Sequence, residues 1–112
     1  MVKNTSVYIE HILEAIANIE ADMQGLDFES FRNDRRARQL LERNLEIISE
    51  ASRGLPQEFK DKEPDIPWKA IAGIGNVLRH DYHSTYPVVL WETVEKDLKP
   101  LKVAVDRIRA SL

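Results

Sequence analysis

The sequence predicts an all-α protein built as a bundle of four or five helices. Apolar residues recur at steps of three and four over most of the chain, and no stretch alternates apolar and polar residues for long enough to form a strand. The 112 residues suit one domain, 1–112, with a substantial core. A content of 43% hydrophobic and 31% charged residues is typical of an ordered globular chain.

The first helix is expected over about residues 6–24. Its apolar residues form one narrow stripe at steps of three and four: Ile9, Ile12, Ile16, Ile19 and Met23. Gly25 follows directly, and glycine is a common residue at the end of a helix.

The second helix is expected from just after Asp27 to Arg53, where Gly54 ends it. Its apolar stripe contains Leu41, Leu45 and Ile48. The stretch 54–67 that follows contains three prolines, which predicts an extended connection.

A third helix is expected to begin near Pro67, because proline is tolerated in a first turn. The last helix has the most regular apolar stripe: Trp91, Val94, Leu98, Leu101, Val105, Ile108 and Leu112. Pro100 lies inside that run and lacks an N–H, so a kink or a break is expected there. Narrow stripes also suit association between subunits, although a single stripe usually fills the core of one chain.

Charge and composition exclude several classes of function. The net charge of −3 excludes nucleic-acid binding driven by net charge, and it leaves a local basic patch open. The lack of cysteine excludes a disulfide framework, a thiolate nucleophile and cysteine-based zinc sites. Because the chain has no apolar run of about 18 residues and no signal-peptide pattern, a soluble, cytoplasmic protein without membrane contact is expected.

A basic segment spans residues 32–43. The segment contains only two acidic residues, and its arginines are Arg32, Arg35, Arg36, Arg38 and Arg43. On one continuous helix, Arg32, Arg36 and Arg43 would lie near one face, and the other two near another. Such a patch suits an RNA backbone or an acidic partner surface. The alternative is a solvated helix face, which is the usual role of a charge run.

Side chains with chemical potential concentrate in residues 76–83. On a helix, Asn76, His80 and His83 share one face, and Arg79 and Tyr82 fall beside it. An imidazole that titrates near neutral pH is a natural general acid or base, and a guanidinium is a natural partner for phosphate. A histidine near a helix end also serves as a capping residue, so both roles stay open.

A metal site is the less favoured interpretation of the same segment. Its ligands would be His80, Asp81 and His83, which spread around the helix, and the remaining histidine, His11, stands alone near the N-terminus.

The sequence resembles the HepT-like proteins of the HEPN superfamily. The similarity runs from Ile66-Pro67-Trp68 through Gly73, Asn76, His80 and Tyr82 to Trp91-Glu92-Thr93-Val94 and then Asp97-Leu98 and Pro100-Leu101. Upstream, the first amphipathic helix and the run 43–51 are also similar, so nearly the whole chain is covered.

The resemblance implies the toxin of a prokaryotic toxin–antitoxin pair. Such proteins are cofactor-free, metal-independent endoribonucleases that dimerise and pair two Arg-Asn-x3-His-x-Tyr motifs across the interface. Their antitoxin is a minimal nucleotidyltransferase, which transfers AMP to the motif tyrosine. Carried over, His80 handles protons, Asn76 takes the asparagine role and Tyr82 is the modified tyrosine.

One motif position departs from the family pattern. Gly75 stands where the family has its arginine. Arg79, adjacent to His80, could bind the phosphate instead, and His83 could join it in a shifted site; a solvated or salt-bridged Arg79 is the alternative. Gly75 therefore also favours a second hypothesis, a catalytically weakened module kept as a binding partner of the nucleotidyltransferase.

Overall fold

The computed structural model describes residues 5–80 and 86–112, and in these two ranges it contains helices and no strand. The all-α prediction is therefore confirmed. The helices, in chain order, are α1 (Thr5–Met23), α2 (Phe28–Arg32), α3 (Arg35–Gly54), α4 (Gln57–Asp61), α5 (Trp68–Ala72), α6 (Ile74–His80) and α7 (Tyr86–Ala110).

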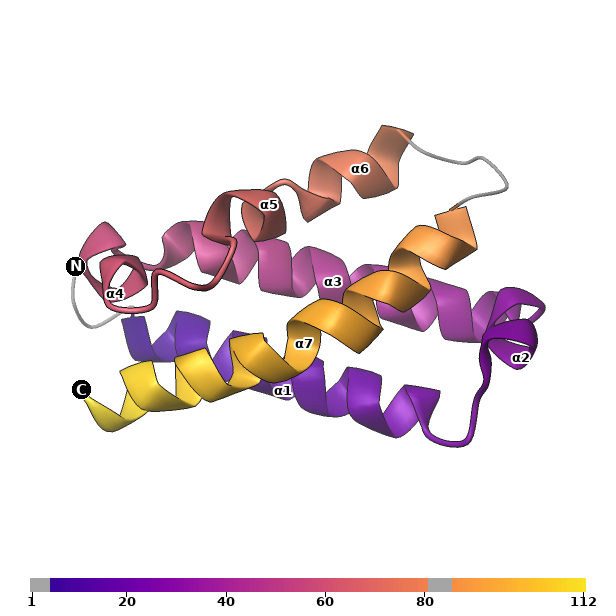
Figure 1. The fold of residues 1–112 in the computed structure, drawn as a ribbon, viewed down its shortest axis with the longest axis horizontal. Helices are drawn as coiled ribbons and strands as arrows, with labels where there is room; N and C mark the ends of the chain where they lie inside the picture. Colours follow the sequence, from indigo (N-terminus) through magenta and orange to yellow (C-terminus); the bar gives the residue numbers. More distant parts are fainter. Residues whose placement is uncertain (1–4, 81–85) are drawn as a thin grey trace.

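The helices form an antiparallel bundle (Figure 1). α1 runs along the long axis, and α3 returns beside it. α5 and α6 then run back along α3, and α7 returns toward the end of the bundle where α1 begins. α1 and α3 share the most extensive contact, and α7 packs against both of them.

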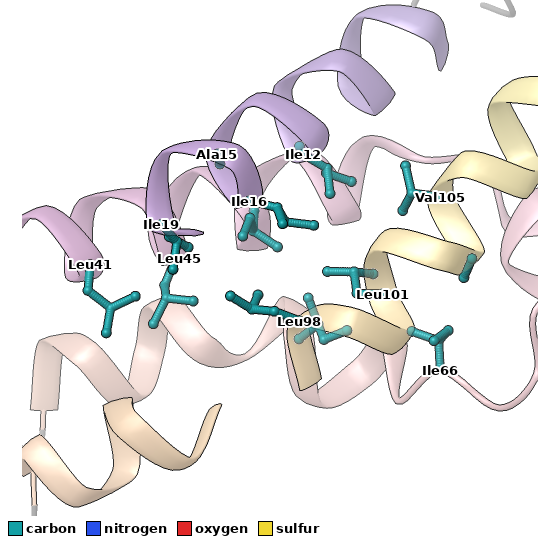
Figure 2. Close-up of a cluster of buried hydrophobic side chains, with 14 of the residues drawn as sticks. Ile12, Ala15, Ile16, Ile19, Leu41, Leu45, Ile66, Leu98, Leu101 and Val105 are labelled. Carbon is teal, nitrogen blue, oxygen red and sulfur yellow. The ribbon is translucent and has the colours of Figure 1, made fainter. Parts of the chain in front are cut away.

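The core lies between α1, α3 and α7 (Figure 2). The side chains drawn there come mainly from these helices: Ile12, Ile16 and Ile19; Leu41 and Leu45; and Leu98, Leu101 and Val105. Each is at most 5% exposed. Because burial of one such side chain contributes roughly 1.5–3 kcal/mol, the predicted stripes account for most of the cohesion of the bundle.

The predicted second helix is wrong in one respect, because it is two helices. α2 ends at Arg32 and α3 begins at Arg35. The Asp27 carboxylate accepts the Ser30 amide at 2.8 Å, and that of Asp34 accepts the Ala37 amide at 3.0 Å. Aspartate at an N-cap position stabilises a helix start, and here it outweighs the continuous helical pattern of the sequence.

The third predicted helix is also divided. α5 ends at Ala72, Gly73 caps it, and α6 starts at Ile74. The connection before α5 is not wholly extended, since α4 forms one short helix within it. The short helices explain why the bundle has more elements than four or five.

α7 passes through Pro100 without a break. Pro100 is exposed, so water can satisfy the carbonyl that loses its donor. The ribbon of α7 changes direction along its length, in keeping with the expected bend (Figure 1). None of the helices described is both long enough and apolar enough to span a membrane.

Candidate functional site

α6 carries three of the predicted site residues. Asn76, Arg79 and His80 lie in its seven residues, and Asn76 is exposed. Asn76 and His80 are four residues apart, a separation that makes side chains neighbours on a helix. Asp81, Tyr82 and His83 lie outside the described residues.

Gly75 lies on the inner side of α6. It is buried, and Leu78, three residues later on the same side, is only 7% exposed. Glycine offers no charge at this position. Arg79 is one turn after Gly75 on the same helix.

An apolar groove of about 200 Å³ opens between α6 and α7. Ile74, Val77 and Leu78 line it from α6, and Val89, Leu90 and Thr93 line it from α7. Val77 is 45% exposed and Val89 39% exposed, which is high for such apolar side chains. The groove therefore leaves an apolar strip uncovered beside the helix that carries Asn76 and His80.

The basic segment is divided between α2 and α3 and is not carried on one continuous helix. Arg32 forms an ion pair with Glu29 at 3.4 Å, and the Arg38 guanidinium donates to the Arg32 carbonyl. Arg35 and Arg36 are exposed in the first turn of α3. Because the helix is interrupted at Asn33 and Asp34, Arg32 cannot share a helix face with the later arginines.

Arg43 lines a different cavity, a cleft of about 430 Å³ between α1 and α3. Tyr8, His11 and Asn18 of α1 line the same cleft. The structure therefore does not bring His11 and Arg43 to α6, where the predicted site lies.

Aromatic contacts attach α2 and the adjacent start of α3, where Arg35 and Arg36 form what we call the arginine corner, to α7. The Trp91 ring centroid lies 5.8 Å from that of Phe28 and 5.5 Å from that of Phe31. Trp91, a member of the apolar stripe predicted for the last helix, thus packs against α2. The contacts hold α2 at the end of the bundle where α6 ends and α7 begins (Figure 1).

Two residues of α3 that the sequence analysis did not single out contact the end of α5, just before α6. Ser49 and Arg53 both donate to the carbonyl oxygen of Ala72, the last residue of α5. A sequence signal was present for Ser49, since a serine four residues after Leu45 continues the buried stripe of α3.

Among the described residues, no three His, Asp or Glu side chains are grouped to hold a metal ion. The less favoured ligand set is not tested, because Asp81 and His83 lie outside those residues.

The chain is similar to known proteins over nearly its whole length. The family model described as ribonuclease HepT-like matches residues 12–108. A protein designated probable ribonuclease HepT, from Thermococcus cleftensis, is 39% identical over 102 residues, which cover 91% of this chain and 93% of that protein. A candidate RNase of Caldanaerobacter subterraneus subsp. tengcongensis is 37% identical over 106 residues, or 95% of each chain. No solved structure matches the chain.

Proposed function

This chain belongs to the HepT-like ribonuclease family, and on that basis we propose that it is a metal-independent endoribonuclease. The observation that carries the proposal is the placement of Asn76 and His80 one turn apart on α6, beside an uncovered apolar groove. We further propose that it is the toxin of a pair whose antitoxin is a minimal nucleotidyltransferase.

The proposed reaction uses the RNA's own ribose as the nucleophile. His80 removes the proton of the 2′-hydroxyl, and the 2′-oxygen attacks the adjacent phosphorus. The bond from phosphorus to the 5′-oxygen breaks, the 5′-oxygen takes a proton, and a 2′,3′-cyclic phosphate remains. Asn76, the neighbour of His80 on α6, supplies an amide that can hydrogen-bond the phosphate.

Arg79 is the candidate for the phosphate-binding cation. Position 79 follows Gly75, which stands where the family has its arginine, by one turn of the same helix. A guanidinium there stabilises the charge that develops on the phosphate oxygens as the 2′-oxygen attacks.

A homodimer supports the same chemistry. Val77 and Val89 leave apolar surface uncovered beside α6, and burial of that surface favours association with a second copy. Two copies of α6 facing one cleft would supply two imidazoles, one to remove a proton and one to donate a proton.

The arginine corner is the candidate contact for RNA outside the cleavage site. Arg35 and Arg36 are exposed at the end of the bundle where α6 ends, and cations at this position can contact the phosphates of a bound strand. An acidic partner surface would suit the same two arginines.

Regulation is proposed at Tyr82. In the transfer step, the tyrosine oxygen attacks the α-phosphorus of ATP and pyrophosphate leaves. The AMP group adds bulk and negative charge two residues after His80, which opposes the binding of RNA phosphate.

A second function is favoured by Gly75. Without the motif arginine, the chain would be a catalytically weakened module that serves to bind the nucleotidyltransferase. Cleavage assays separate the two functions, since only the first requires turnover of RNA.

The test is cleavage of single-stranded RNA by the purified protein in the presence of a chelator. We expect His80→Ala to lower the rate by about 10²–10⁴-fold and Arg79→Ala to lower it by about 10²–10³-fold. His11→Ala is the matched control, because His11 is exposed on α1 and lines the other cleft. Cleavage that persists in His80→Ala, or that requires added divalent metal, would contradict the mechanism.

A further inference from the structure

The junction between α5 and α6 is held in place by side chains of α3. Ser49 Oγ donates to the Ala72 carbonyl oxygen at 2.8 Å. The Arg53 guanidinium donates to the same oxygen through Nε at 3.1 Å and Nη2 at 2.8 Å. Three donors therefore converge on one backbone oxygen, and Ser49 is fully buried.

This oxygen is the one that would connect α5 to α6 in a continuous helix. In an uninterrupted helix the Ala72 carbonyl would accept the amide of Asn76, four residues later. Instead, the Asn76 amide donates to the Gly73 carbonyl at 3.0 Å. The hydrogen-bond ladder of α6 therefore starts anew at the Gly73 carbonyl, and the donors of α3 hold the Ala72 carbonyl.

α6 is too short to fix its own orientation in the bundle. It contains seven residues, which is well below the roughly 12–15 residues that an isolated helix needs to be stable. α3 is 20 residues long and packs against both α5 and α6. The orientation of α6 thus depends on α3.

We infer that Ser49 and Arg53 are positioning residues for the proposed ribonuclease site. By holding the Ala72 carbonyl, they set the rotation of α6 and so the direction in which positions 76 and 80 face the substrate. The inference rests on the proposed function for its effect on catalysis, and its structural part can be measured separately.

The experiment compares two buried serines of α3. Ser49→Ala removes the hydroxyl that contacts Ala72, whereas Ser52→Ala removes a hydroxyl that donates only within α3, to the Ser49 carbonyl at 2.8 Å. Both variants lose one buried hydrogen bond, so they share the general cost in stability. Arg53→Gln and Arg53→Lys test the guanidinium, with lysine keeping one charged donor.

Two measurements are made on protein that circular dichroism shows to be folded. For RNA cleavage, we expect Ser49→Ala combined with Arg53→Gln to lower kcat by about tenfold or more and to leave KM within about twofold. Arg53→Lys should retain more activity than Arg53→Gln, and Ser52→Ala should match the wild type. In ¹H–¹⁵N spectra, the amide signals of residues 74–80 should shift in Ser49→Ala and not in Ser52→Ala.

The outcomes distinguish this inference from the proposed function. Equal effects of Ser49→Ala and Ser52→Ala on kcat and on the α6 amides would overturn the positioning role. If the wild type does not cleave RNA, the proposed function fails, and the amide shifts alone decide whether α3 sets the rotation of α6.

Discussion

At the scale of single residues, Gly75 determines which residue can supply the cation of the proposed site. Asn76 beside it is exposed, whereas Gly75 itself is buried and carries no charge. We propose that a phosphate bound near Asn76 and His80 takes its cation from the next turn of α6, at Arg79. With Gly75 in place of the motif arginine, the spacing of Asn76 and His80 still matches the family motif.

Tyr82, which lies outside the described residues, is predicted to be the residue that the nucleotidyltransferase modifies. Incubation of the protein with the nucleotidyltransferase and ATP should add one AMP group to the peptide that contains Tyr82, and RNA cleavage should fall in proportion to the modified fraction. The physical reason is that a phosphodiester beside the motif repels the RNA phosphate and occupies its space. Peptide mass spectrometry measures the modification.

The control for this prediction is a set of tyrosine variants. Tyr82→Phe should abolish labelling, while Tyr8→Phe and Tyr86→Phe should be labelled as the wild type is. Equal labelling of Tyr82→Phe would place the acceptor at another residue and remove this mode of regulation.

The sequence could predict part of the site and not the rest. Once a helix is expected there, the spacing of Asn76 and His80 alone predicts that they are neighbours on it. The contact of Ser49 with Ala72 joins residues 23 positions apart, and its acceptor is a backbone carbonyl that any residue type could supply. Such a contact depends on how α3 packs against α5, which the local pattern does not contain.

At the scale of elements, the wrong sequence predictions are helix boundaries that are set by local capping. Periodicity correctly predicted α1 and the long course of α7, because their apolar stripes are continuous. The same criterion joined α2 to α3 across Asn33 and Asp34 and joined α5 to α6 across Gly73. Asp34 stabilises a new helix start and Gly73 a helix end, and both are local effects that an apolar stripe does not reveal.

Glu63 links the connection before α5 to α7, and it should make stability depend on pH. The Arg107 guanidinium donates to both carboxylate oxygens, at 2.7 and 3.1 Å, and Trp68 Nε1 donates to the Glu63 carbonyl at 3.1 Å. The hydrogen bonds from Arg107 lower the pKa of the Glu63 carboxyl below its ordinary value of 4.5. The ion pair therefore stabilises the fold above about pH 4.5, and this contribution is lost as the pH falls through the lowered pKa.

We expect Glu63→Gln to reduce the free energy of unfolding at pH 7, measured by urea denaturation. The difference from the wild type should shrink below about pH 4.5, because protonated Glu63 and glutamine are both neutral. Glu58→Gln is the control, since Glu58 is an exposed carboxylate on α4 in the same segment. A difference that is constant from pH 7 to pH 3 would show that Glu63 acts through packing and not through its charge.

At the scale of the whole molecule, the proposed site and the arginine corner lie toward one end of the bundle. α6 ends there, α7 begins there, and the Phe28, Phe31 and Trp91 rings hold the arginine corner at the same end (Figure 1). The bundle measures 28 × 22 Å across its long axis. A stacked strand advances about 3.4 Å per nucleotide, so about eight nucleotides would span that end of the molecule.

The uncovered groove between α6 and α7 leads us to predict that two copies of the chain associate there. We expect the protein to be a homodimer of two 12.9 kDa chains, joined through the surface that contains Val77 and Val89. Val77→Asp and Val89→Asp would each place a carboxylate in the buried interface, which should weaken the dimer by at least about thirtyfold, or about 2 kcal/mol. Multi-angle light scattering at micromolar concentration measures the change in mass. Val103→Asp should leave the mass unchanged, because Val103 is 51% exposed on the later part of α7, away from the groove.

The same variants connect assembly to catalysis. If one site needs α6 from two chains, Val77→Asp and Val89→Asp should lose RNA cleavage together with the dimer, although His80 and Arg79 are unchanged. Activity should return as protein concentration rises above the new dissociation constant, because mass action restores the dimer. A wild-type mass of one chain would contradict the assembly, and full activity in a monomeric variant would show that a single α6 is a complete site.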